Sequence, residues 1–161
     1  MSLTITVFGR PAPQGSKRYI GGSSKQGGRF IEASKYLPAW RKAITLAAIT
    51  EIEKEAWAQS SSPIAIEVMF YLERPATIPV AKRPWPIKPP DLDKLLRGVL
   101  DGLTDAGVWD DDGQVVKITA WKAYADTREP GAFIEITPIV DDLGLDLPYS
   151  QGKVECLCLR E

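Results

Sequence analysis

The chain contains no histidine among its 161 residues. Zinc sites built on imidazole ligands, Ser-His-Asp triads and nucleases that use a histidine as general base are therefore excluded. If this protein hydrolyses a bond, we expect its nucleophile to be a water molecule activated by a metal ion.

Cysteines and long apolar runs are also scarce. The only two cysteines, Cys156 and Cys158, are separated by one residue, a spacing that rarely forms a disulfide. No apolar run approaches the roughly 20 residues of a membrane span, and the N-terminus lacks a signal-peptide pattern. The sequence therefore predicts a cytoplasmic protein with no membrane partner.

Charge is distributed unevenly, although the formal net charge is only −1. Residues 1–50 contain eight lysines and arginines and a single acid, Glu32, whereas residues 101–161 contain five such bases and thirteen acids. This asymmetry favours a protein with a surface for a polyanion and a separate site for cations. A basic face that is merely solvated is the alternative.

Hydrophobic periodicity predicts a single α+β domain over residues 1–139. Alternating apolar residues indicate strands at 3–7 and 64–72 and a hairpin formed by 115–125 and 132–138. Helical spacing indicates one helix from an N-cap at Ser34 to about residue 58 and a second from 92 to 106, ending at Gly107. The order β-α-β-α-β-β predicts one mixed sheet with two main helices packed on it, and residues 140–161 form an acidic extension with no assigned role.

Two basic segments interrupt this pattern. Residues 9–31 are rich in glycine and serine and are expected to form a long hairpin or loop. Residues 74–90 contain six prolines, so they are expected to form an extended loop rather than a helix or a central strand. The candidate DNA-binding residues in these segments are Arg18, Lys25, Arg29, Lys82, Arg83 and Lys88.

The acidic residues after the second segment are the most informative feature. Asp91 and Asp93 stand at the start of the second helix, and Asp110, Asp111 and Asp112 follow its end. Crowded carboxylates repel one another unless a cation lies between them, and Mg²⁺ favours such ligands. The alternatives are that Asp91 caps the helix and that the triplet is a solvated turn.

Geometry decides whether the first pair can act together. Residues i and i+2 of a helix point in nearly opposite directions, so Asp91 and Asp93 converge only if Asp91 lies on extended backbone. The prolines at 89 and 90 favour that extended conformation. Arg97 lies one turn after Asp93, where it could pair with Asp93 or with a substrate phosphate. The chain has no P-loop and no dinucleotide fingerprint, so no nucleotide cofactor is expected.

A multi-position motif in this region resembles the RusA family of Holliday junction resolvases, which are common in phages and prophages. It comprises Pro90-Asp91-Leu92-Asp93, Leu95, Asp101, Leu103-Thr104, Ala106-Gly107, Trp109, Asp111-Asp112 and Gln114. The resemblance implies a homodimeric, Mg²⁺-dependent endonuclease that places symmetric nicks in four-way DNA junctions. Such a protein, if phage-encoded, would act in the host cytoplasm, and Mn²⁺ would substitute for Mg²⁺.

The resemblance also assigns roles to individual residues. The essential metal-binding acids of the family fall on Asp91, Asp93 and Asp112, with Asp111 adjacent. The functional lysine of the family is replaced by Arg97 and its asparagine by Lys94, and either residue could stabilise charge on the scissile phosphate. A flap- or fork-selective nuclease of the same fold and a non-catalytic junction-binding protein are the alternatives.

The helix between the two acidic groups is about 20 Å long. Residues 107–112 could bring Asp112 back to Asp93 only by running straight along this helix. This geometry favours a site completed by a second copy of the chain over one completed within a single chain.

Overall fold

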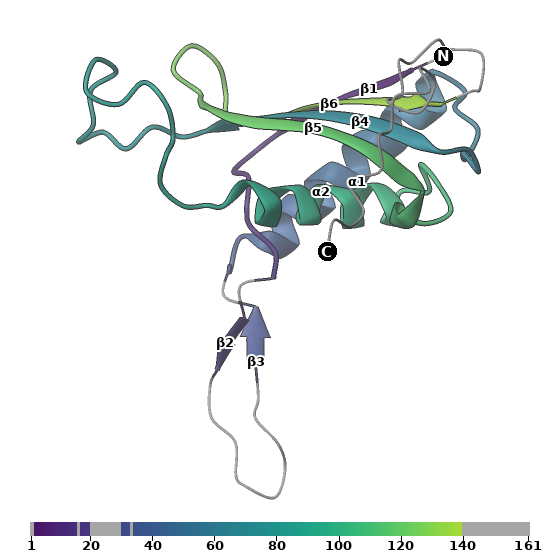
Figure 1. Ribbon diagram of the computed structural model, residues 1–161, viewed down its shortest axis with the longest axis horizontal. Coiled ribbons are helices and arrows are strands. Elements are labelled where there is room, and N and C mark those ends of the chain that lie inside the picture. The colour runs from purple at the N-terminus through teal and green to yellow at the C-terminus, as the bar shows by residue number, and fades with distance from the viewer. Residues whose placement is uncertain (1, 16, 20–29, 33, 140–161) are drawn as a thin grey trace, which may run out of the picture.

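The computed structural model describes residues 2–15, 17–19, 30–32 and 34–139 (Figure 1). The predicted DNA-binding residues Lys25 and Arg29, and the extension over 140–161, lie outside these residues. In chain order the elements are β1 (Leu3–Phe8), β2 (Lys17–Tyr19), β3 (Phe30–Glu32), α1 (Leu37–Lys54), β4 (Ile64–Leu72), α2 (Leu92–Asp105), a 3₁₀ turn η1 (Asp112–Gln114), β5 (Val115–Tyr124) and β6 (Gly131–Pro138).

One mixed sheet and two helices form the body of the domain, as the sequence predicts. The strand order is β1-β6-β4-β5, with β4 and β5 parallel and the other pairs antiparallel. Both helices lie on the same side of this sheet (Figure 1). The strand β4, the helix α2 and the strand β5 form a β-α-β unit, in which the helix carries the chain between two parallel strands.

The core lies between the sheet and the two helices. Every second residue of β1 is buried, and β4 alternates in the same way because successive side chains of a strand point to opposite faces. The helices contribute Trp40 and Ile44 from α1 and Leu95, Val99 and Leu103 from α2. Each of these side chains stabilises the fold by roughly 1.5–3 kcal/mol relative to exposure in water, which fixes α2 on the sheet.

The predicted hairpin between β5 and β6 is wrong. The strand β4 lies between them and pairs with both. Because the β-α-β crossover places β5 parallel to β4, the chain must then cross the end of β4 to pair on its other side. The crossing loop is held there by Arg74, whose guanidinium donates two hydrogen bonds to Asp126 at 2.5 and 2.7 Å.

The first helix also begins later than expected. Its N-cap is Tyr36 rather than Ser34, and Pro38 lies within the first two positions of the helix. If Ser34 were the N-cap, the Ser34 carbonyl would have to accept a hydrogen bond from the N–H of residue 38, and proline has no N–H. With Tyr36 as the N-cap, Pro38 lies in the first turn, whose N–H groups have no partner within the helix. The helix ends at Lys54 rather than near residue 58, and Ala56 follows it with a φ of 49°.

The two basic segments emerge from the same end of the domain. Strands β2 and β3 pair antiparallel and project from the body, which agrees with the expected hairpin for the described part of residues 9–31 (Figure 1). The proline-rich segment forms a second projection before α2. Among the described residues, no helix is long and apolar enough to cross a membrane.

The contact between the helices generates a stability prediction. A Cβ at Gly102 would lie 2.9 Å from the Ile44 Cγ2, whereas one at Gly98 would meet its nearest atom at 3.4 Å. Gly98→Ala should therefore gain helix propensity, while Gly102→Ala should displace a buried side chain. We expect Gly102→Ala to be less stable than Gly98→Ala by about 1–3 kcal/mol in urea unfolding. Equal stabilities would contradict the close helix packing.

Candidate active site

The first pair of acids lies at the exposed N-terminus of α2. Asp91 has extended backbone, with φ −71° and ψ 142°, and its side chain makes no capping hydrogen bond to the helix. Asp91 therefore occupies the N-cap position of α2, but its carboxylate does not cap the helix. Asp93 follows in the first turn, also exposed, so both carboxylates face solvent rather than the core.

Two lysines surround Asp91. The Lys94 Nζ lies 2.8 Å from the Asp91 Oδ2. The hydrogen bond and the charge of Lys94 lower the pKa of Asp91, and the charge of Lys122 lowers it further. In turn, Asp91 and, more weakly, Asp93 raise the pKa of Lys94. Lys94 thus pairs with Asp91 and is also stabilised by the charge of Asp93.

Lys122 fixes the backbone that leads into this site. Its ammonium donates hydrogen bonds to the carbonyl oxygens of Lys88, at 3.1 Å, and Pro90, at 2.7 Å. It extends from β5, so the sheet holds the end of the proline-rich segment in place. The sequence carries no signal for this role beyond the position of Lys122 on a predicted strand.

The second group of acids forms a tight turn before β5. The Asp111 carboxylate accepts a hydrogen bond from the Gly113 N–H at 2.7 Å, and the Gln114 Oε1 accepts from the backbone amides of Asp110 and Asp111. The Asp110 carboxylate accepts from Gln59 at 2.9 Å. Both side chains therefore help to build the turn, which favours Asp112, exposed in the first position of η1, as the metal ligand of this group.

The turn is anchored to the body of the domain. The Gln114 Nε2 donates to the carbonyl oxygens of Ser60 and Ser62. The Trp109 ring is buried, and its Nε1 donates to the Thr104 Oγ1 at 2.8 Å. The Trp57 Nε1 donates to the Val108 carbonyl at 3.0 Å. Asp112 is therefore held rigidly near the C-terminal end of α2.

The two acidic groups lie at opposite ends of α2. Its fourteen residues correspond to about 20 Å of helix. The strand β5 starts at the turn and runs back until Lys122 reaches the carbonyl oxygen of Pro90. Among the residues that the structure describes, no three acidic side chains are grouped so that they could hold a metal ion.

A further acid of the motif, Asp101, has a structural environment. It accepts hydrogen bonds from the side chains of Gln14 and Arg41. Arg41 also binds Asp105, and the hydrogen bond from Arg41 lowers the pKa of Asp105. These contacts join the segment after β1 and the helix α1 to α2, so Asp101 stabilises the packing of the helices.

Arg97 points toward the base of the β2–β3 hairpin. A Cβ at Gly15 would lie 2.7 Å from the Arg97 Nη1, so the guanidinium lies against this glycine. The Gln14 N–H donates to the Lys94 carbonyl at 2.8 Å, which fixes the same segment on α2. Within the described part of the chain, Arg97 forms no salt bridge with Asp93.

The predicted DNA-binding residues that are described lie on the two projections. The backbone of Arg18 belongs to β2. Lys82 and Lys88 are exposed in the proline-rich segment, and Arg83 is half-buried there. The structure therefore places these candidates at the end of the domain that carries Asp91.

A sequence model of one protein family, described as endodeoxyribonuclease RusA, matches residues 9–137. The chain belongs to the RusA endodeoxyribonuclease family. The match begins just after β1 and covers β4, β5, both helices and both acidic groups of this RusA protein. No curated protein matches the chain closely enough to count as a relative.

Membership of the RusA family implies endodeoxyribonuclease activity on Holliday junctions and a general dependence on divalent metal. The exposed oxygens of Asp91 and Asp93 are suitable ligands for a hard cation. A site made from one chain is nevertheless short of acids, since Asp112 lies beyond the far end of α2.

The environment of Asp91 generates a titration prediction. Because its pKa is lowered, Asp91 should remain ionised to a lower pH than an ordinary aspartate. Lys94→Gln should raise the pKa of Asp91 toward its usual value, as measured by NMR of the side-chain carboxyl carbon. Lys54→Gln, at the C-terminal end of α1, is the control and should leave the Asp91 titration unchanged. An unaltered pKa in Lys94→Gln would contradict the role of this lysine.

Proposed function

We propose that this RusA-family protein is a Mg²⁺-dependent, structure-selective endodeoxyribonuclease that resolves four-way junctions by paired symmetric nicks. Asp91 and Asp93 of one subunit and the partner subunit's Asp112 form each active site. The observation that carries the proposal is the placement of exposed carboxylates at both ends of one rigid unit, α2 and β5. A junction has near two-fold symmetry, and a C2 dimer with two such sites matches it.

The exposed side of this unit supports a dimer. Within the described part of the chain, β5 pairs with β4 alone, so its other edge is free to contact a second copy. Val116 and Ile118 on this strand are 64% and 45% exposed. The half-buried residues Leu92, Leu96 and Leu100 form a stripe on α2 with the spacing of one helix face.

A two-fold axis across this surface would align two copies antiparallel. The beginning of β5, which carries Asp112, would then face the other end of the same unit in the partner. Since Lys122 joins that end of β5 to Pro90, the partner subunit's Asp112 would approach Asp91 and Asp93. Such an arrangement completes the set of acids without bending α2.

The chemistry follows from these residues. Asp91, Asp93 and Asp112 would hold Mg²⁺, or Mn²⁺ in its place, and Asp111 would orient the turn that presents Asp112. When bound, the cation supplies an activated water and positive charge opposite the phosphate. Lys94, in the first turn of α2, and Arg97, in the second turn, would stabilise negative charge on the scissile phosphate.

The proposal predicts that the acids are needed for cleavage and not for binding. Asp91→Asn, Asp93→Asn and Asp112→Asn should each lower junction nicking in Mg²⁺ by about a hundredfold or more, because a charged group at the reacting phosphate is lost. Junction binding should persist or tighten, since repulsion of phosphate falls. Asp105→Asn, which removes an acid bound to Arg41, is the matched control and should retain activity.

The substrate separates the alternatives. Wild-type protein should nick a labelled four-way junction faster than a flap, a fork or linear duplex. A preference for flaps would identify a flap nuclease of the same fold. Tight junction binding without metal-dependent cleavage would identify a non-catalytic junction-binding protein and contradict the proposal.

The basic projection should supply affinity rather than chemistry. Lys82→Gln with Lys88→Gln should weaken junction binding and reduce the slope of log affinity against log salt by about one unit per lost phosphate contact. Lys54→Gln is the control. It removes a lysine charge at the C-terminal end of α1, outside the basic projections, and should leave the slope unchanged. An unchanged slope in the double variant would place the DNA elsewhere.

A further inference from the structure

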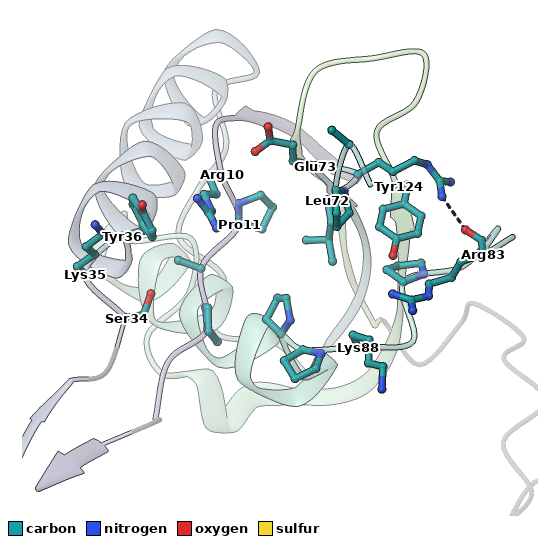
Figure 2. Close-up of a pocket in the computed structure, with 18 residues that line it drawn as sticks. Arg10, Pro11, Ser34, Lys35, Tyr36, Leu72, Glu73, Arg83, Lys88 and Tyr124 are labelled. Atoms are coloured by element: carbon teal, nitrogen blue, oxygen red, sulfur yellow. Dashed lines mark hydrogen bonds between the residues drawn. The ribbon is translucent and has the colours of Figure 1, made fainter. Parts of the chain in front are cut away.

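A cavity of about 870 Å³ lies between the two basic projections. Its walls come from the segment after β1, the start of α1, the end of β4 and the proline-rich segment (Figure 2). Proline, alanine and leucine side chains, among them Pro11, Ala12 and Leu72, give it apolar walls. Clefts of roughly 300–1,000 Å³ accommodate drug-sized ligands, a size class that includes a mononucleotide.

Positive charge gathers around this cavity. Arg10, Lys35, Arg83 and Lys88 line it, and within the described residues none of them forms a salt bridge. Glu73 is the single acid among the described lining residues. Cations without an acidic partner beside an apolar cavity favour a ligand that has negative charge at one end and an apolar ring at the other.

Two aromatic rings complete the lining. The Arg10 guanidinium carbon lies 4.4 Å from the centre of the Tyr36 ring, so this ring carries a cation at the cavity wall (Figure 2). On the other side, Arg74 lies 3.9 Å from the centre of the Tyr124 ring and donates a hydrogen bond to the Arg83 carbonyl at 2.6 Å. Aromatic rings beside arginines are the usual elements that hold unpaired bases in single-strand binding proteins.

The cavity adjoins the candidate active site through the chain itself. Pro89 and Pro90 form part of its wall, and Asp91 follows directly. A DNA strand with a phosphate at Asp91 would therefore pass the cavity mouth. Lys88 lines the cavity, and its carbonyl oxygen accepts a hydrogen bond from the Lys122 ammonium, which fixes Lys88 near the site.

We propose that this cavity receives one unpaired nucleotide of the branched DNA, displaced from its partner next to the cleaved phosphodiester. The base enters between the apolar walls and the two tyrosine rings, and the flanking phosphates bind Arg10, Arg83 and Lys88. This inference rests on the proposed function and adds a recognition step to it. Displacing a base from its partner costs the least free energy where the base is already mismatched. The protein should therefore bind most tightly to junctions with mismatched pairs at the crossover.

The test compares two junctions that differ only in base pairing at the crossover. Binding is measured by fluorescence anisotropy in the presence of a chelator, so that no cleavage occurs. Wild-type protein should bind the junction with mismatched crossover pairs about tenfold more tightly than the fully paired one. Equal affinities would overturn the proposal.

Variants locate this preference in the cavity. Ala76→Glu adds an acid to an exposed lining residue, whereas Thr77→Glu adds the same charge one residue away, outside the lining. The preference for the mismatched junction should disappear in Ala76→Glu and persist in Thr77→Glu. Loss or retention in both variants alike would overturn the assignment to the cavity.

A second matched pair tests the aromatic wall. Tyr36→Ala should abolish the preference, while Tyr71→Ala should keep it. Tyr71 pairs with Arg128 at 4.2 Å, in a contact like that of Tyr36 with Arg10, but it does not line the cavity. A preference that survives in Tyr36→Ala would contradict stacking at this wall.

The outcome is separable from that of the proposed function. If wild-type protein nicks junctions in Mg²⁺ but shows no preference for mismatched crossovers, the cavity proposal alone fails. If the preference follows the cavity variants but no branched DNA is cleaved, the nuclease proposal fails and the nucleotide site stands.

Discussion

The length and rigidity of one helix, α2, determine where the acids of this protein can meet. The helix is fixed to the sheet by Leu95, Val99 and Leu103 and to α1 through the close approach at Gly102. The turn that carries Asp112 is tied to its far end by Trp109 and Thr104. Because neither end can move independently, one chain presents two separate groups of carboxylates.

The charged groups also differ between the two ends of α2. At the start of α2, Lys94 and Lys122 partly neutralise Asp91 and leave its carboxylate ionised and exposed. At the other end, Asp111 accepts a hydrogen bond from a backbone amide and Asp110 accepts one from Gln59, whereas Asp112 faces solvent. The described parts of the basic projections lie near the first group only, which supports the proposal that DNA binds beside Asp91 and that a second copy supplies Asp112.

Sequence patterns predicted the parts of the fold that depend on local periodicity. The helix α2 was predictable because its apolar residues recur at helical spacing. Gly107, which was predicted to end this helix, has the expected positive φ of 75°. The hairpin prediction for β5 and β6 failed because strand pairing is a non-local property, set here by the crossover from β4. The start of α1 depended on one missing amide, that of Pro38, which outweighed the capping tendency of Ser34.

The candidate site was likewise only partly predictable from the sequence. The motif identified the acids, and the extended backbone before Asp91 was predictable from its two prolines. The role of Lys122 was not, because it reaches the site from a strand 31 residues later in the chain. The turn-forming contacts of Asp111 were also hidden, since a run of three aspartates does not reveal which side chain binds its own backbone.

The proposed nuclease depends most directly on a site shared between two subunits. Subunits carrying Asp91→Asn can be mixed with subunits carrying Asp112→Asn, after unfolding and refolding together, and assayed on a labelled junction in Mg²⁺. Each mixed dimer should regain one intact site, because one subunit supplies Asp91 and its partner supplies Asp112, and it should recover single-strand nicking. No recovery, with mixed dimers shown to form by mass spectrometry, would place all three acids in one chain and contradict the account.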